Sequence, residues 1–181
     1  MDRKIVKISK FLSYVLRHRP KAIGLEMNPQ GWVSVEDLLS AANKAGVPLN
    51  RCLLQEVVER NDKKRFSFSE NGRWIRANQG HSIDVDLGLR PRKPPEQLYH
   101  GTTQRFVKSI KQKGLLKGNR RHVHLSKDVD TAMKVGQRHG RPVVLTVLSG
   151  EMYRAGHTFY LSENGIWLTD CVKPQYLIFP E

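Results

Sequence analysis

The sequence predicts an α+β protein built from two small lobes. Helix-like and strand-like patterns occur in both halves of the chain, and 181 residues suffice for two compact cores. A stretch over residues 81 to 97 separates the halves and has three prolines among the five positions from Pro91 to Pro95. Such a stretch is typical of a stiff, exposed linker. We therefore expect lobes at residues 1–80 and 98–181.

A helix over residues 4 to 18 opens the first lobe. Its apolar residues recur at helical spacing: Ile5, Ile8, Leu12, Val15 and Leu16. It must end before Pro20, because the residue before a proline is pushed out of the α region. A short strand is expected around Leu25, followed by a turn at residues 28 to 31 and a second strand at Trp32-Val33.

Two further helices and a hairpin complete the first lobe. Ser34 is placed to cap a helix that ends near Gly46, and Asn50 is placed to cap the next one. Residues 63 to 69 alternate like a strand, and Asn71-Gly72 is the signal of a type I′ hairpin turn. The order of helix, strand, helix, helix and hairpin predicts a winged-helix module, a relative of the helix-turn-helix.

Short strands and helices alternate in the second lobe. Leu98-Tyr99-His100 is strand-like, and residues 105 to 113 form a helix that Gly114 closes, with Phe106, Val107 and Ile110 turned inward. Ser126 is placed to cap a further helix. More strands are expected at residues 123–125, 142–148, 165–168 and 176–179. The second lobe is therefore also α+β.

The charge of the chain points to a polyanionic partner. Lys and Arg number 31 against 17 Asp and Glu, which gives a formal net charge of +14. The excess of basic over acidic residues is spread over both halves. Residues 1–97 contain 18 basic and 11 acidic residues, and residues 98–181 contain 13 basic and 6 acidic residues. Nucleic acid is the leading class of partner, although a generally basic solvated surface would give the same count.

The two cysteines and the hydropathy pattern indicate a cytoplasmic protein. Cys52 and Cys171 lie far apart without C-x-x-C spacing, so neither a zinc ribbon nor a disulfide framework is predicted. No apolar run approaches the roughly 20 residues that span a bilayer, and the charged N-terminus lacks the apolar segment of a signal peptide. We expect no membrane partner.

Basic side chains of the first lobe offer candidate anion ligands. Arg17 and His18 end the first helix together, although the helix macrodipole alone favours cations there. Strand alternation places Lys63 and Arg65 on one face, with Lys64 on the other. The planar fork of Arg65 suits bidentate binding of a terminal phosphate.

The second lobe carries a different set of polar candidates. In His100-Gly101-Thr102 a glycine between hydrogen-bonding side chains would let a ligand approach the backbone. Strand geometry predicts Arg120, His122 and His124 on one side. The H-x-H spacing alone suits a metal, but no third ligand accompanies it, so no metal is expected.

Five segments, in order, resemble one known family. They are KFLSYVLRHRP at residues 10–20, GWVSVEDLL at 31–39, DKKRFS at 62–67, LYHGT at 98–102 and HVHLS at 122–126. Together they resemble the NAD-dependent RNA 2′-phosphotransferases over nearly the whole chain. The resemblance implies a winged-helix RNA-binding lobe, followed by an NAD-binding lobe with the ADP-ribosyltransferase fold, meeting at a cleft.

The resemblance also implies the reaction and its catalytic residues. Arg17, His18, Arg65 and Arg120 match the essential Arg-His-Arg-Arg set of the family, with Arg121 as the position most easily confused with Arg120. In that family the splice-junction 2′-phosphate of tRNA-like RNA attacks NAD, nicotinamide leaves, and the resulting 2′-phospho-ADP-ribosylated RNA is resolved. The products are 2′-OH RNA and ADP-ribose 1″,2″-cyclic phosphate. NAD is thus a co-substrate.

A second set of matches concerns NAD. His100 and His124 match the two histidines of the family's pattern, and Ile166 stands where protein-modifying ADP-ribosyltransferases carry a catalytic glutamate. That absence suits a reaction in which a ribose hydroxyl must stay available as the second nucleophile. Neighbouring residues are also assigned to NAD: Gly101, Thr102, Leu125, Ser126, Asn164 and Gly165.

Two other functions use the same features. An ADP-ribosyltransferase that caps terminal phosphates of RNA or DNA would need the same pocket and would stop after the first step. A non-catalytic winged-helix regulator would explain the charge and the hairpin, but it leaves Arg120 and the two strand histidines without a role. No obligate protein partner is evident, and a monomer is expected.

Overall fold

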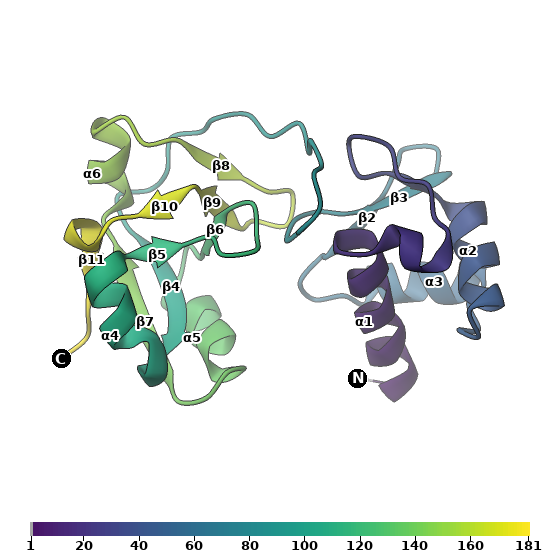
Figure 1. Ribbon diagram of the computed structural model, residues 1–181, viewed down its shortest axis with the longest axis horizontal. Coiled ribbons are helices and arrows are strands. Elements are labelled where there is room, and N and C mark those ends of the chain that lie inside the picture. The colour runs from purple at the N-terminus through teal and green to yellow at the C-terminus, as the bar shows by residue number, and fades with distance from the viewer. Residues whose placement is uncertain (1) are drawn as a thin grey trace. The chain divides into compact units, whose positions relative to one another are not determined.

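The computed structural model describes residues 2–181, which divide into two compact units (Figure 1). Among the described residues, the units comprise 2–88 and 89–181. Each combines helices with small antiparallel sheets, so the predicted α+β class is confirmed. No helix within the described residues is long and apolar enough to cross a membrane.

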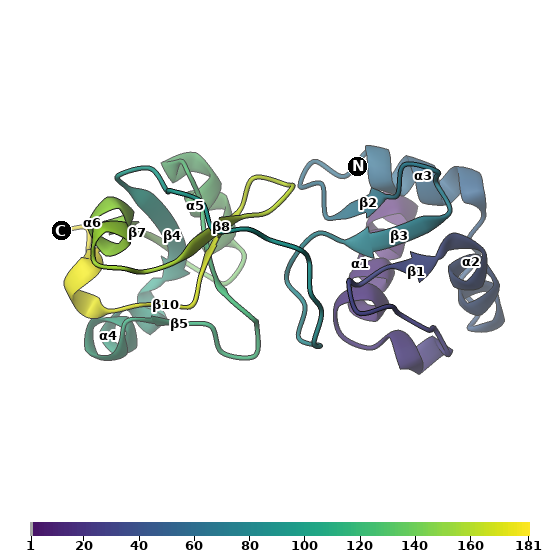
Figure 2. The same ribbon diagram turned by 90° about the horizontal axis from the view of Figure 1, so that it is seen from above.

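Helices and one sheet make up the first unit. Its helices are α1 (Arg3–Arg17), the 3-10 helix η1 (Pro20–Ile23), α2 (Val35–Lys44) and α3 (Arg51–Glu59). Its strands are β1 (Val33–Ser34), β2 (Phe66–Phe68) and β3 (Trp74–Ala77), which form an antiparallel sheet in the order β1-β3-β2. Figure 2 shows these strands side by side, and α1 packs against β3. The element order is therefore the predicted one, and the winged-helix assignment stays a prediction.

The helices of the first unit begin where the sequence predicts. The Ser34 hydroxyl accepts a hydrogen bond from Asp37 N–H at 3.3 Å, and the Asn50 side chain accepts one from Leu53 N–H at 2.8 Å. These caps satisfy backbone donors that the first helical turn leaves unpaired. All five predicted apolar residues of α1 are buried. The apolar core of the unit is made by α1, α2, α3 and the strands together.

Two local predictions in the first unit are wrong. Leu25 is buried but is not in a strand, because η1 occupies the preceding residues and Gly24 turns the chain with φ +72°. The hairpin turn is not type I′, since Gly72 has φ +69° but Asn71 does not have positive φ. Instead the Asn71 side chain accepts a hydrogen bond from Arg73 N–H at 3.0 Å within a wider loop.

Short strands and helices alternate in the second unit. Its helices are α4 (Gln104–Lys113), α5 (Val129–Gln137), α6 (Ser149–Arg154) and the 3-10 helix η2 (Pro174–Tyr176). Its strands are β4 (Leu98–Thr103), β5 (Leu115–Leu116), β6 (Val123–Leu125), β7 (Pro142–Val147), β8 (Phe159–Leu161), β9 (Trp167–Thr169), β10 (Cys171–Val172) and β11 (Leu177–Ile178). They form antiparallel sheets in the orders β11-β7-β4, β6-β9-β8 and β10-β5. Sequence patterns missed α6, β5, β8 and β10, because elements this short show no clear periodicity.

Two side-chain predictions in the second unit need correction. Phe106 is 42% exposed rather than inward, while Ile110 is buried as predicted. Asp128, not Ser126, caps α5 and accepts a hydrogen bond from Thr131 N–H at 2.7 Å. Ser126 instead exchanges two backbone hydrogen bonds with Tyr99, each 2.8 Å long.

Residues 81 to 97 contain no helix or strand and most of them are exposed, but both ends of the stretch are hydrogen-bonded to the folded units. On the first unit, His81 is 2% exposed and Ser82 N–H donates to the carbonyl of Arg17 at 3.0 Å. On the second unit, Arg92 N–H donates to the carbonyl of Phe159 at 2.8 Å. Paired backbone groups therefore hold both ends of the stretch against the unit to which each belongs.

Candidate functional site

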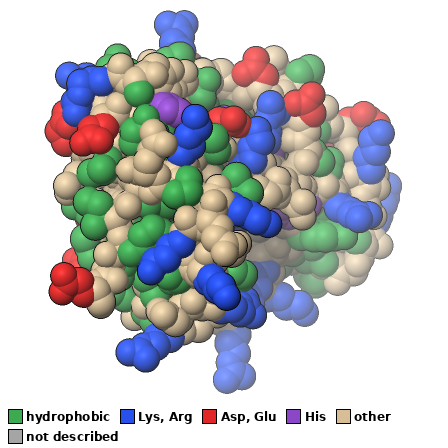
Figure 3. All heavy atoms as spheres, turned by 60° about the vertical axis from the view of Figure 1, so that its left-hand side comes forward, with side chains coloured by type: hydrophobic (Ala, Val, Ile, Leu, Met, Phe, Trp, Pro, Cys, Tyr) green, Lys and Arg blue, Asp and Glu red, His purple; other side chains and the backbone are tan. Residues whose placement is uncertain are grey.

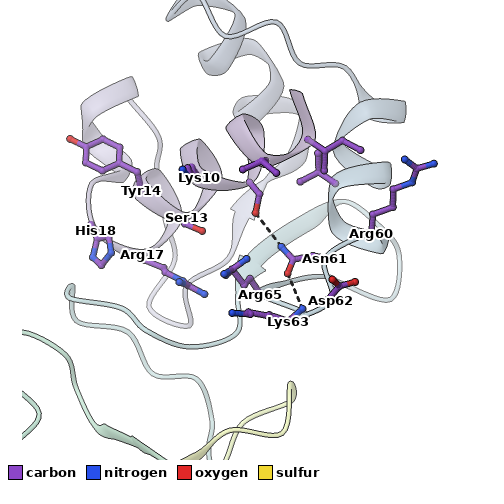
Figure 4. A pocket seen from close by; sticks show the side chains of 14 residues that line it. Lys10, Ser13, Tyr14, Arg17, His18, Arg60, Asn61, Asp62, Lys63 and Arg65 are labelled. Atoms are coloured by element: carbon purple, nitrogen blue, oxygen red, sulfur yellow. Dashed lines mark hydrogen bonds between the residues drawn. The ribbon is translucent and has the colours of Figure 1, made fainter. Parts of the chain in front are cut away.

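The first unit contains a pocket between the outer side of α1 and residues 57–65 (Figure 4). Its cavity volume is about 560 Å³, which lies in the range of small-molecule sites. Cationic side chains dominate its polar lining: Lys10, Arg17, Arg60, Lys63 and Arg65. His18 and Tyr14 also line it. The structure thus brings the predicted Arg17, His18 and Arg65 to one cavity.

Arg17 is held at the end of α1 by the chain that follows β3. Its side chain is half-buried, and its guanidinium lies against the backbone of Gly80. A Cβ built on Gly80 would be 3.5 Å from the guanidinium carbon, an ordinary van der Waals contact, so space does not require a glycine here. The backbone conformation does favour one, because Gly80 has φ +86°.

His18 follows as the C-cap of α1 and is oriented by Ser82. The ring Nδ1 lies 2.8 Å from the Ser82 hydroxyl oxygen, and Ser82 N–H donates to the carbonyl of Arg17. A hydroxyl both donates and accepts, so Ser82 can hydrogen-bond this nitrogen with or without its proton. Sequence reasoning missed Ser82, because its segment was interpreted as linker.

A turn, not a strand, presents Lys63 and Arg65. Strand β2 begins only at Phe66, and Lys64 has φ +42°, so the predicted alternation over Lys63 to Arg65 is wrong. The turn nevertheless directs Lys63 and Arg65 to the pocket (Figure 4). Few residues other than glycine adopt this left-handed backbone conformation. Contacts with neighbouring residues must therefore hold Lys64 in it.

Two buried asparagines hold this turn. Asn61 accepts a hydrogen bond from Lys63 N–H at 3.2 Å and donates one to the Ser9 hydroxyl of α1, also at 3.2 Å (Figure 4). Asn78 donates from its side chain to the carbonyl of Lys64 at 2.7 Å and from its backbone to the carbonyl of Arg65 at 2.9 Å. Sequence reasoning missed both, although Asn61, at the end of a predicted helix, is a typical turn residue.

In the second unit, Arg120 contacts His124, which links two predicted site residues. The guanidinium Nη1 lies 3.3 Å from His124 Nδ1. Because a guanidinium has no acceptor, Nδ1 must accept, which leaves the ring proton of His124 on Nε2.

His100 lies beside this pair with the opposite arrangement of its ring nitrogens. Its Nδ1 is 3.0 Å from the carbonyl oxygen of His124, so Nδ1 carries the proton and donates. Desolvation of the ring lowers the pKa of His100, and the charge of Arg120 lowers it further, while the bond to His124 acts in the other direction. A neutral His100 therefore offers the lone pair of Nε2 as an acceptor.

The remaining residues predicted for NAD lie on neighbouring segments of this unit. The backbone pair Tyr99–Ser126 joins β4 to the end of β6, and Leu125 pairs with Trp167 of β9. Asn164, Gly165 and Ile166 form the turn that leads into β9, where the Ser162 hydroxyl bonds the Asn164 side chain at 2.5 Å and accepts from Ile166 N–H at 3.1 Å. The structure thus places β4, β6 and this turn next to one another.

Gly101 and Thr102 are explained by packing. A Cβ on Gly101 would lie 1.8 Å from the carbonyl oxygen of Ala132, so the glycine admits the backbone of α5 rather than an opening for a ligand on that side. Thr102 is 8% exposed, and Leu125 and Ser126 are also buried. At these positions only backbone atoms or small exposed portions of the side chains remain for a ligand.

The H-x-H histidines do not share one environment. His122 lies before β6, so the prediction that strand geometry aligns it with Arg120 is wrong. Its ring packs against Tyr160, with centroids 5.4 Å apart, and burial lowers its pKa. Within residues 2–181, no three or more His, Cys, Asp and Glu side chains gather in a way that could hold a metal ion.

Comparison with known proteins adds an independent observation. Residues 3–171 match the family model described as RNA 2′-phosphotransferase, Tpt1/KptA family. The chain is 57% identical over 169 residues to the Probable RNA 2′-phosphotransferase of Agrobacterium fabrum, covering 93% of this chain and 91% of that protein. Proteins of the same name from Flavobacterium johnsoniae and Nostoc punctiforme are 55% and 53% identical, covering 99% and 97% of both chains respectively.

Proposed function

The chain belongs to the RNA 2′-phosphotransferase family, Tpt1/KptA, and from this membership we propose that it removes an internal 2′-phosphate from RNA by transferring it to NAD. Its relatives are named RNA 2′-phosphotransferases, which supports the transferase activity. The observation that carries the proposal is the pocket of the first unit, where Arg17, His18 and Arg65 converge from separate segments.

The 2′-phosphate is bound by the cations of that pocket. A phosphomonoester has a second pKa near 6 and is therefore close to dianionic at neutral pH. Arg17 and Arg65 bind it through paired N–H donors, and Lys63 adds a point charge. Arg120 completes the set, as the family pattern implies.

An ionised phosphate needs no general base to act as a nucleophile. In the first step its oxygen bonds to the anomeric carbon of the nicotinamide ribose, and the bond to nicotinamide breaks. The arginines hold the phosphate in position for this attack, because fixing the two reactants in the right geometry lowers the barrier of the reaction. Very tight binding of the phosphate alone would not raise turnover.

The second step releases the RNA. The ribose O2″ would give up its hydroxyl proton to water and bond to phosphorus while the bond to the RNA 2′-oxygen breaks, and His18 donates a proton to that oxygen as it leaves. Charge builds on the phosphoryl oxygens during this step, where the guanidiniums stabilise it most. A histidine suits the role, because its usual pKa lies near neutral pH.

The histidines of the second unit are suited to hold NAD, which supplies an electrophilic anomeric carbon and a leaving group. The His100 Nε2 lone pair accepts from a ribose hydroxyl, and His124 Nε2–H donates to an acceptor on the dinucleotide. Arg120 keeps the His124 ring in this form. Ile166 carries no carboxylate, so the ribose O2″ stays available for the second step.

The test is an assay of the purified protein with NAD and a 2′-phosphorylated oligonucleotide. We expect release of nicotinamide, 2′-OH RNA and ADP-ribose 1″,2″-cyclic phosphate, with Arg65→Ala reduced by about 100-fold or more. His18→Ala should accumulate the ADP-ribosylated RNA intermediate. Failure of the wild type to consume NAD would refute the proposal, and a stable ADP-ribose cap without cyclic phosphate would favour a capping transferase instead.

A further inference from the structure

Helix α4 is strongly and uniformly basic. It carries Arg105, Lys108, Lys111 and Lys113, and no Asp or Glu occurs anywhere from Gln97 to Lys127. All four cations are exposed, because the helix buries only Ile110 and part of Val107. No ion pair involving these four side chains occurs within residues 2–181.

This arrangement costs the helix stability. Arg105 and Lys108, and then Lys108 and Lys111, stand three residues apart, where like charges repel. Arg105 also lies in the first turn, where the positive end of the macrodipole disfavours a cation. Lys111 and Lys113 stand in the last turn, where the macrodipole favours cations, but the helix gives no such reason for the charges of Arg105 and Lys108.

An exposed aromatic ring accompanies the cations. Phe106 is 42% exposed, and the Arg105 guanidinium lies 4.6 Å from the centre of its ring. At the other end of the helix, Lys111 Nζ lies 5.2 Å from the centre of the Phe179 ring. Cations combined with accessible aromatic faces are the side chains that bind nucleic acid through its phosphates and bases.

A second basic segment meets the start of α4. Gln104 N–H donates to the carbonyl of Arg141 at 3.3 Å, which places the loop between α5 and β7 beside the first turn of α4. That loop carries exposed Arg138 and Arg141, and no Asp or Glu occurs between Thr131 and Gly150. Figure 3 shows Lys and Arg side chains gathered on the lower part of the unit's nearer face, with most Asp and Glu towards its upper part and left edge.

We propose that this α4 patch, defined as Arg105, Phe106, Lys108, Arg138 and Arg141, binds the phosphate backbone of a folded RNA substrate away from the reacting nucleotide. Choosing RNA as the occupant rests on the proposed function, and the charge of the patch is complementary to RNA. The patch contains none of the residues assigned to the 2′-phosphate or NAD. It therefore contributes to affinity for long RNA without taking part in the chemistry.

The first experiment measures binding of a stem-loop RNA without a 2′-phosphate over a series of salt concentrations. Arg105→Gln/Lys108→Gln should lower affinity about tenfold and flatten the plot of log affinity against log salt by about 0.9 for each lost phosphate contact. The control Arg90→Gln/Lys93→Gln removes the same charge from exposed positions outside the patch. Equal losses in both variants, or an unchanged slope in the first, would overturn the proposal.

The second experiment separates the patch from the catalytic site. With 2′-phosphorylated stem-loop RNA, Arg105→Gln/Lys108→Gln should raise KM about tenfold and leave kcat unchanged, while turnover of a 2′-phosphorylated trinucleotide stays at the wild-type rate. Arg138→Gln/Arg141→Gln should have the same effect on KM and kcat. Because these two residues lie outside α4, the same result in both variants could not come from misfolding of that helix. Loss of trinucleotide turnover would contradict the patch, whereas a wild type inactive on both RNAs would refute the proposed function and leave the binding experiment as the test of the patch.

Discussion

At the end of α1, two neighbouring residues obtain their orientation from a segment more than 60 positions away. Gly80 lies against the Arg17 guanidinium, and Ser82 hydrogen-bonds both the Arg17 carbonyl and the His18 ring. The helix fixes only the backbone positions of Arg17 and His18. Contacts with the segment after β3 orient their side chains, so we regard Ser82 as a positioning residue for His18.

Replacing Ser82 should therefore slow turnover without weakening RNA binding. Ser82→Ala removes the bond that orients His18 but leaves the imidazole in place, so we expect kcat to fall about tenfold, less than the roughly 100-fold or more that a general acid contributes, with KM nearly unchanged. Ser82→Thr keeps a hydroxyl and should restore at least half of the rate. Steady-state kinetics of both variants make the comparison; a rise in KM with normal kcat would show that Ser82 acts on binding instead.

At the scale of single elements, the turn before β2 is the part of the site that depends most on buried polar contacts. Lys64 adopts a left-handed conformation, and Asn61 and Asn78 together bond the backbone on both sides of it. A hydrogen-bonded asparagine can hold a turn that the chain does not prefer by itself.

Loss of Asn61 should affect stability and substrate binding together. Asn61→Ala removes its bonds to Ser9 and Lys63, and we expect the free energy of unfolding to fall by about 1–3 kcal/mol with a several-fold rise in KM for the 2′-phosphorylated RNA. Asn71→Ala is the matched control, because Asn71 stabilises a loop outside the pocket. It should lower stability with KM unchanged. Denaturant unfolding and kinetics test both.

Gly101 offers a separate test of packing. Its neighbour Ala132 leaves no room for a Cβ, so Gly101→Ala must push α5 away from β4. We expect thermal unfolding at a clearly lower temperature, whether or not NAD is present. A variant as stable as the wild type but defective in NAD binding would show that the glycine serves the ligand.

Sequence patterns predicted the long elements and missed what depends on tertiary contacts. The periodicity of α1 and the caps at Ser34 and Asn50 are local signals, and the structure confirms them. Local alternation failed at Lys63 to Arg65, because buried asparagines impose the turn there. Proline content at residues 81 to 97 could not indicate the hydrogen bonds at both ends of this stretch, because their partners in α1 and β8 are distant in the sequence. Residue type and spacing singled out Arg17, His18 and Arg65 as anion ligands, but their assignment to one reaction came only from the family resemblance.

At the scale of the whole molecule, the chain places a cationic pocket in one unit and two hydrogen-bonded histidines in the other. Each unit has its own apolar core. The net charge of the chain is strongly positive, and basic residues outnumber acidic residues in both halves. The stability of the second unit, which holds these histidines, should therefore depend on pH.

Acid should destabilise the second unit through His100. The pKa of His100 is lowered in the folded state, so the unfolded chain binds the proton first, and stability is lost as the pH falls through the usual histidine pKa of about 6.5. His122, whose pKa is also lowered, adds to this. Thermal unfolding at pH 7.5 and pH 5.5 should show a drop that is smaller in His100→Asn. An equal drop in both would mean that other groups control the acid response.

The most direct measurement of the central claim compares affinities for a short RNA with and without its 2′-phosphate, in the absence of NAD. The wild type should prefer the phosphorylated RNA by about 100-fold, since two guanidiniums bind the phosphate, and Arg65→Ala should reduce this preference at least tenfold. Arg60→Ala removes a cation from the same pocket that pairs with Glu56 at 3.0 Å, and it should keep the preference. An unchanged preference in Arg65→Ala, or an equal loss in Arg60→Ala, would contradict the assignment of the 2′-phosphate to this pocket.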